Sequence, residues 1–223
     1  MKIAELFYSL QGEGVLIGVP SFFIRTSGCN LRCSWCDTPY TSWQPEGEEL
    51  TLEQILQAVE AHPARHVVVT GGEPMIAPAI VDLTNRLRDL GMHITIETAG
   101  TVFQPVECDL MSISPKLANS TPTGDQAARH ERLRIQIGPL RQLMERYDYQ
   151  LKFVVEKRED MAELRKLVGD LGAPPDRVIL MPEGTDPAPL RERALWLAEI
   201  CKQDGFRFSP RLHIDLYGSR RGV

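Results

Sequence analysis

The chain has 223 residues, of which 43% are hydrophobic and 25% charged, a composition typical of a soluble globular protein with one substantial core. Its net charge of −5 and its scattered Lys and Arg residues exclude the basic stripe of a typical nucleic-acid-binding protein, and no apolar run could span a bilayer. The N-terminus does not resemble a signal peptide. We therefore expect a single domain over residues 1–223 in the cytoplasm, without a direct nucleic-acid or membrane partner.

Short β-rich runs alternate with amphipathic helical patterns along the chain. In chain order, the pattern predicts a strand at 21–26, a helix at 51–60, strands at 66–70, 93–97 and 110–114 with a helix at 80–90 among them, a strand at 150–155, a helix at 160–171, a strand at 178–181, a helix at 190–201 and a strand at 207–212. Thr51 and Gln54 are placed to form a capping box at the start of the first helix. The polar stretch from Asn119 to Glu131 contains Pro122 and Gly124, so we expect a mobile loop there and a candidate lid.

The strands are nearly continuous apolar runs, which indicates a parallel sheet covered by helices. About six or seven strands fit, fewer than a full eight-stranded barrel needs. In such α/β folds the chemistry lies at the carboxyl ends of the strands. Cys29 follows the first strand, Gly71-Gly72 the second, Glu97 ends the third and Ser114-Pro115-Lys116 end the fourth. The pattern therefore predicts one composite site at this edge.

Three of the five cysteines, Cys29, Cys33 and Cys36, lie within eight residues. Their spacing lets one loop hold three thiolates around an iron–sulfur or zinc centre. A structural zinc ion usually takes four protein ligands, and the next cysteine is 72 residues further on. Cys108 and Cys201 have apolar surroundings and are expected to be ordinary buried thiols. Three thiolates on a four-iron cluster would leave one iron open to a small molecule.

With Trp35 before its last cysteine, the CxxxCxxC loop resembles the radical S-adenosylmethionine superfamily. The resemblance implies an incomplete (βα) barrel of the radical S-adenosylmethionine type and one [4Fe–4S] cluster on the three cysteines. It also implies that S-adenosylmethionine binds the open iron and yields a 5′-deoxyadenosyl radical that abstracts hydrogen from the substrate.

A larger set of motifs resembles one family, the 7-carboxy-7-deazaguanine synthases of the queuosine and deazapurine pathway. The motifs are LQGEG at 10–14, CxxxCxWCDT at 29–38, TGGEP at 70–74, IETAG at 96–100, SPK at 114–116 and LHIDLYGSRRGV at 212–223. The implied reaction is that of a lyase, which converts 6-carboxy-5,6,7,8-tetrahydropterin into 7-carboxy-7-deazaguanine with loss of ammonia. An external one-electron donor such as a flavodoxin or ferredoxin, and a homodimeric state, are implied as well.

The family resemblance also assigns roles to individual residues. Contacts with S-adenosylmethionine are implied for Trp35, Gly72, Glu97, Ser114, Pro115, Lys116, Met181, Pro182, Glu183 and Gly184. Contacts with the substrate are implied for Leu10, Gln11, Gly12, Glu13, Arg25, Thr70, His213 and Val223. Arg25 would pair with the substrate carboxylate, and Thr38 would be a ligand of Mg²⁺.

Alternatives remain open at the level of the residues themselves. Trp35 also fits a core tryptophan, Glu97 a solvated carboxylate, Arg25 a local ion pair and Thr38 a helix N-cap. Two alternative functions also remain. One is an activase of the same superfamily that places a glycyl radical on a partner enzyme, and the other is a non-enzymatic iron–sulfur or zinc structural module.

Overall fold

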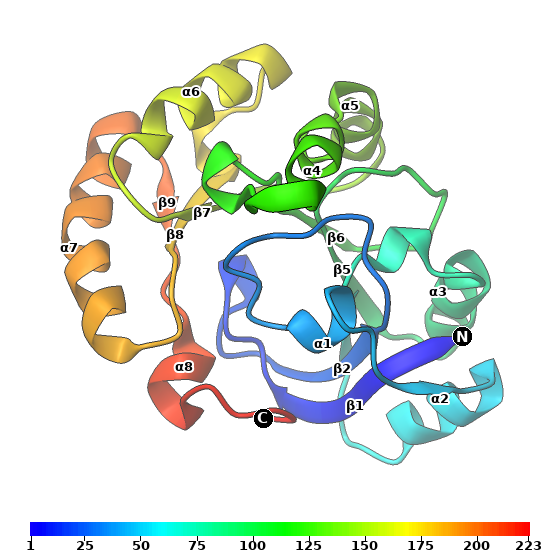
Figure 1. The fold of residues 1–223 in the computed structure, drawn as a ribbon. Coiled ribbons are helices and arrows are strands. Elements are labelled where there is room, and N and C mark those ends of the chain that lie inside the picture. The colour runs from blue at the N-terminus through cyan, green and yellow to red at the C-terminus, as the bar shows by residue number, and fades with distance from the viewer.

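Nine strands form one curved sheet in the computed structural model, which describes residues 1–223 (Figure 1). Their spatial order is β3-β1-β2-β4-β5-β6-β7-β8-β9. The strands are β1 Lys2–Leu10, β2 Pro20–Thr26, β3 Glu48–Glu49, β4 His66–Gly71, β5 His93–Thr98, β6 Leu110–Ile113, β7 Tyr149–Val155, β8 Val178–Pro182 and β9 Arg207–Phe208. All neighbours from β2 to β9 are parallel, whereas β1 is antiparallel to both β2 and β3.

Most of the helices cover the outer face of this sheet, and α1 lies across its open end (Figure 1). The helices are α1 Pro39–Ser42, α2 Leu52–Glu60, α3 Ile80–Asp89, α4 Ala127–Leu133, α5 Ile137–Arg146, α6 Asp160–Leu171, α7 Pro187–Asp204 and α8 Leu212–Tyr217. The predicted capping box at the start of α2 is confirmed, with Gln54 N donating to Thr51 Oγ1 and Thr51 N donating to Gln54 Oε1. None of the helices combines the length and apolar character that crossing a bilayer requires.

The core explains why the apolar runs become central strands. Residues 67–69 of β4 and 178–181 of β8 are buried on both faces of the sheet, between the barrel interior and the outer helices. One cluster of 34 buried apolar residues joins these strands to α2, α3, α5, α6 and α7. The predicted incomplete α/β barrel is confirmed, with nine strands instead of about six or seven.

Two predicted segments were wrong. The expected strand at 207–212 is only Arg207–Phe208, and Leu212 begins α8, because Pro210 has no backbone N–H to continue the ladder. The expected mobile loop from Asn119 to Glu131 instead holds two 3₁₀ turns and most of α4, and buried His130 fixes that helix to the protein. Strand β1 and helix α5 were not predicted at all.

Candidate active site

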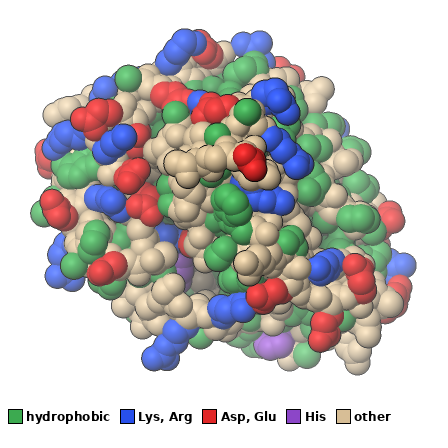
Figure 2. Space-filling model, in the orientation of Figure 1, with side chains coloured by type: hydrophobic (Ala, Val, Ile, Leu, Met, Phe, Trp, Pro, Cys, Tyr) green, Lys and Arg blue, Asp and Glu red, His purple; other side chains and the backbone are tan.

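A polar pocket opens at the carboxyl ends of the parallel strands, where the sheet topology gathers the predicted site residues. Figure 2 shows this end of the molecule, with a hollow below its centre. All eight predicted substrate residues line the pocket, as do Trp35, Thr38, Gly72, Glu97, Ser114, Lys116 and Met181. Pro115, Pro182, Glu183 and Gly184 do not line it. Glu183 pairs instead with Arg193 of α7, at 2.6 Å.

The cysteine loop lies directly after β2 and borders this pocket. Cys33 is buried, and Cys29 and Cys36 are half-buried around an apolar contact of Leu31 with Ala99. Burial raises the pKa of Cys29 to about 12 and that of Cys33 to about 11, so these thiols ionise at neutral pH only beside a strong positive charge. An iron centre supplies that charge.

The three thiols belong to one loop, from Cys29 to Cys36. Thiolates that bind a four-iron cluster contact different iron atoms, so they need not converge on one point. The donor set, three thiols on one loop, therefore fits the predicted cluster.

Polar groups at the ends of β4 and β6 lie beside this loop. The Lys116 ammonium lies 5.6 Å from the centre of the Trp35 ring and donates to Ser114 Oγ at 2.8 Å. Gly72 packs so closely that a Cβ there would lie 2.1 Å from Gly28 O. These are the residues assigned to S-adenosylmethionine, and the fold places them next to the cysteines.

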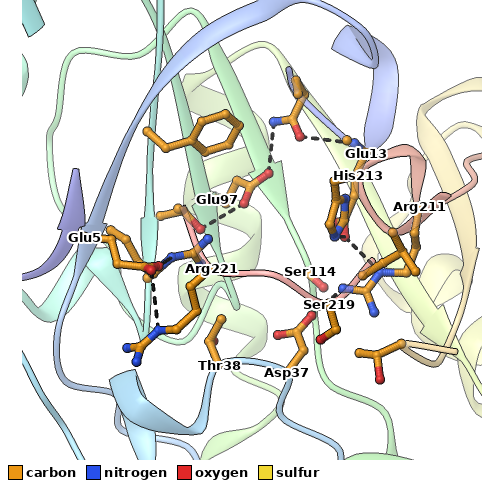
Figure 3. Close-up of a pocket in the computed structure, with 18 of the residues that line it drawn as sticks. Glu5, Glu13, Asp37, Thr38, Glu97, Ser114, Arg211, His213, Ser219 and Arg221 are labelled. Carbon is orange, nitrogen blue, oxygen red and sulfur yellow. Dashed lines mark hydrogen bonds and ion pairs between the residues drawn. The ribbon is translucent and has the colours of Figure 1, made fainter. Parts of the chain in front are cut away.

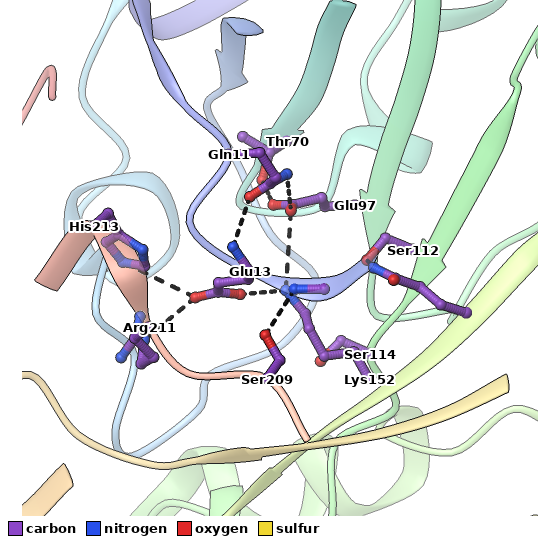
Figure 4. A network of polar contacts seen from close by, with 12 residues as sticks. Gln11, Glu13, Thr70, Glu97, Ser112, Ser114, Lys152, Ser209, Arg211 and His213 are labelled. Atoms are coloured by element: carbon purple, nitrogen blue, oxygen red, sulfur yellow. Dashed lines mark hydrogen bonds and ion pairs between the residues drawn. The ribbon is translucent and has the colours of Figure 1, made fainter. Parts of the chain in front are cut away.

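A buried network of charges also lines the pocket (Figure 4). The Glu13 carboxylate forms an ion pair with Lys152, and it accepts a hydrogen bond from Arg211 Nε at 3.3 Å. His213 Nε2 lies 4.0 Å from the same carboxylate. Burial alone would raise the pKa of Glu13, but Lys152 and Arg211 hold it well below its usual range. Glu13 is therefore an anion in this pocket.

Arg211 also joins this network to the end of the cysteine loop. Its guanidinium donates to the Asp37 carboxylate and, at 2.6 Å, to Gly184 O. Although burial opposes ionisation of Asp37, Arg211 keeps its pKa below the ordinary value. Thr38 follows directly and occupies the N-cap position of α1, where its side chain makes no capping hydrogen bond. Its hydroxyl oxygen, 3.3 Å from Thr41 Oγ1, is available to a further ligand.

Glu97 lies among the residues assigned to the substrate. Its two carboxylate oxygens accept hydrogen bonds from Gln11 Nε2 at 3.2 Å and from Thr70 Oγ1 at 2.9 Å. Gln11 Oε1 in turn accepts from Glu13 N at 3.1 Å. This chain of contacts holds the LQGEG segment against β4 and β5.

A second ionic cluster forms the rim of the pocket near the C-terminus (Figure 3). Glu5 Oε2 lies 2.7 Å from Arg25 Nε and accepts a hydrogen bond from Tyr40 OH at 2.8 Å. Arg221 Nε lies 3.5 Å from Glu5 Oε1, and its guanidinium stacks on Tyr40 at 3.4 Å from the ring centre. The C-terminal segment is thereby held across the pocket, with Val223 among the lining residues.

Sequence reasoning missed Glu5, Tyr40, Lys152, Arg211 and Arg221. One signal was present, because Lys152 interrupts an otherwise apolar strand, Leu151–Val155, in which a charge needs a buried partner. The other four residues lie in segments that are not uniformly apolar, where a polar or charged side chain is no exception to the pattern.

Comparisons with known proteins agree with this geometry. The model of the Radical SAM superfamily matches residues 23–137, the part of the chain that holds the cysteine loop and strands β4 to β6. A 7-carboxy-7-deazaguanine synthase from Halobacterium salinarum is 46% identical over 97% of this chain and 90% of its own length. This chain belongs to the 7-carboxy-7-deazaguanine synthase family. A Rhodopirellula baltica enzyme of the same name is 46% identical over 100% of this chain and 89% of its own length.

Solved structures support the same family. QueE from Escherichia coli superposes with a TM-score of 0.70 at 28% identity, over 95% of this chain and 94% of that chain. SuiB from Streptococcus suis, in a complex with its precursor peptide SuiA, shares the fold with a TM-score of 0.59 at 18% identity, over 84% of this chain and 47% of that chain. Membership of the radical S-adenosylmethionine enzymes implies a [4Fe–4S] cluster and S-adenosylmethionine. The named relatives decide against the activase and the structural module.

Proposed function

We propose that this protein converts 6-carboxy-5,6,7,8-tetrahydropterin into 7-carboxy-7-deazaguanine with release of one ammonia, within queuosine and deazapurine biosynthesis. One observation carries the proposal. The pocket beside the cysteine loop has an ionised Glu13 on one wall and the Arg25 guanidinium at its rim, as a substrate with ring N–H donors and a carboxylate requires. Relatives that share nearly the whole chain carry the name of this activity.

Cys29, Cys33 and Cys36 would hold the cluster, and Trp35, Gly72, Ser114 and Lys116 would hold S-adenosylmethionine. When bound, these two groups supply the one-electron chemistry that starts a radical reaction on the substrate. The protein's own part is to place the substrate within reach and to exclude water. Both tasks fall to the parts of the chain that line the pocket, which are the cysteine loop, the polar side chains of the walls and the C-terminal segment.

The pterin would bind in the pocket beside the LQGEG segment. Because Lys152 and Arg211 keep Glu13 ionised, its carboxylate accepts hydrogen bonds from ring N–H groups without first losing a proton. Gln11 and Thr70 add amide and hydroxyl groups to the same wall, and both are already oriented by Glu97. Because these hydrogen bonds already orient the two side chains, binding costs less conformational entropy.

Arg25 would bind the substrate carboxylate. Glu5 lies against its Nε, and the ring of Phe7 lies 5.4 Å below its guanidinium carbon. The two terminal nitrogens form the planar fork that suits a carboxylate. The Thr38 hydroxyl would be a ligand of a Mg²⁺ ion, which when bound would help to orient the same carboxylate.

We also propose that a flavodoxin or ferredoxin supplies the electron, that the protein acts as a homodimer, and that it works in the cytoplasm. The relatives and the fold are compatible with each of these proposals.

An anaerobic turnover assay tests the proposed reaction. The reconstituted protein receives reductant, S-adenosylmethionine, Mg²⁺ and 6-carboxytetrahydropterin, and mass spectrometry follows the products. We expect 7-carboxy-7-deazaguanine, lost in Cys33→Ala and sharply reduced in Arg25→Leu. S-adenosylmethionine cleavage without that product, in protein with an intact cluster, would refute the proposed substrate but keep the superfamily.

A further inference from the structure

The segment from 117 to 130 holds the cysteine loop in place from outside. Ser34 N donates to Ser120 O at 2.8 Å, and Trp35 Nε1 donates to Asn119 O at 3.0 Å. Arg32 N donates to His130 Nδ1 at 3.1 Å. Three residues of the loop, all between Cys29 and Cys36, thus donate N–H groups to this one segment.

The segment is itself anchored to the barrel. Asn119 Nδ2 donates to Asp160 Oδ2 at 2.8 Å and to Val154 O at 3.2 Å. The same Asp160 oxygen accepts from the backbone N–H groups of Glu156 and Lys157 at 2.9 and 3.1 Å. The cysteine loop is therefore tied to β7 and α6 rather than to a mobile loop.

His130 is the only side chain of α4 that is fully buried, with 1% of its surface exposed. Its second ring nitrogen, Nε2, lies 2.9 Å from Ser120 Oγ, and that hydroxyl donates to Leu117 O at 2.6 Å. Because Nδ1 accepts the Arg32 amide and Ser120 has already given its proton away, the ring proton belongs on Nε2. One neutral tautomer then satisfies both ring nitrogens of His130 and the Ser120 hydroxyl.

We propose that His130 is a positioning residue for the iron–sulfur cluster. Its ring accepts the backbone N–H of Arg32 and so keeps that N–H away from the cluster sulfurs. Arg32 directly precedes Cys33 in the turn between Cys29 and Cys33, so its amide is near the cluster by covalent connection. Hydrogen bonds from amides to cluster sulfurs raise the reduction potential. An amide bound to His130 cannot make such a bond, which keeps the potential low.

The role of His130 concerns the cluster and does not depend on which substrate the pocket takes. A matched pair of substitutions separates it from simple space filling. Asn places an acceptor oxygen where His130 carries Nδ1, whereas Leu has nearly the same size without an acceptor. His130→Asn should keep the Arg32 hydrogen bond, and His130→Leu should lose it.

The readouts are the rate of iron release to a chelator and the midpoint potential of the cluster, both without substrate. We expect His130→Leu to release iron about tenfold faster, the lower end of the effect of residues that orient metal ligands. Its potential should move to more positive values. His130→Asn should stay near the parent protein in both measurements.

The thermal melting of each apoprotein shows whether it folds, and His62→Leu is the control because His62 is exposed and packs on Tyr8 and Phe22 instead. Equal behaviour of the Leu and Asn variants would overturn the proposal, because the acceptor would then not matter. An unchanged potential and iron release in a folded His130→Leu protein would also overturn it.

Discussion

Lys152 and Glu13 form an ion pair inside the pocket, although 139 residues separate them in the chain. The Lys152 side chain is 6% exposed and that of Glu13 14% exposed, so solvent screens the pair weakly. Lys152 also lies 3.9 Å from Glu97 Oε1. One buried cation therefore balances two of the carboxylates that surround the proposed pterin position.

Removal of Lys152 should destabilise the protein and weaken substrate binding. In Lys152→Met the Glu13 carboxylate keeps only Arg211 as a cationic hydrogen-bond partner, so we expect a loss of about 3 kcal/mol in the free energy of unfolding. Urea denaturation of the apoprotein measures the loss. The double variant Glu13→Gln, Lys152→Met should recover part of that stability, since no unpaired charge remains. A double variant less stable than Lys152→Met would contradict the role of the pair.

The same network predicts a dependence of stability on pH. Arg211 and Lys152 depress the folded-state pKa of Glu13, whose ordinary value is 4.5. As the pH falls, Glu13 therefore takes up its proton in the unfolded chain before it does so in the folded protein. The stability that ionised Glu13 contributes is fully present above about pH 4.5 and is lost below it. Between pH 7 and pH 3 the free energy of unfolding should fall less steeply in Glu13→Gln than in the parent. The two slopes should differ by up to about 1.4 kcal/mol per pH unit. Parallel curves would refute this contribution.

Gly72 should be irreplaceable for packing as well as for ligand binding. A Cβ at Gly72 would lie 2.1 Å from Gly28 O and 2.7 Å from Thr41 O, and neither backbone can move without shifting the cysteine loop. We expect Gly72→Ala to lose most of its iron after reconstitution. Gly138→Ala is the control, because its Cβ would meet nothing within 4 Å and Ala favours the helix. Full iron content in Gly72→Ala would contradict this packing.

Arg221 should act on substrate affinity. It contacts Glu5 and Tyr40, which surround Arg25, and it holds the C-terminal segment across the pocket. In Arg221→Ala we expect KM for the pterin to rise several-fold while kcat changes little, since Arg221 contacts residues around Arg25 at the rim and none of the cysteines. Arg191→Ala on α7 should leave both constants unchanged. A fall in kcat at constant KM would assign Arg221 a different role.

The central strands were predictable because they are buried on both faces and therefore read as unbroken apolar runs. Strand β1 was not predicted because most of its residues are only half-buried and charged residues interrupt its apolar pattern. The region from Asn119 to Arg146 looked like a loop followed by an undefined stretch. Its order comes from distant contacts such as that of His130 with Arg32, which no local pattern reveals.

The same distinction holds for the site. The cysteine loop and the motifs at the strand ends were predictable because their spacing is local and the parallel topology brings strand ends together. The partners that set the charges are far apart in sequence, since 198 residues separate Arg211 from Glu13. Only the folded barrel shows that Glu13 has two cationic partners.

The most direct test of the proposed reaction counts its products under anaerobic turnover with excess substrate. We predict one ammonia for each 7-carboxy-7-deazaguanine formed. We also predict many turnovers for each S-adenosylmethionine consumed, because the proposed reaction would return the hydrogen at its end and so regenerate S-adenosylmethionine. Deazaguanine formed without equal ammonia, or one S-adenosylmethionine spent in every turnover, would contradict the account.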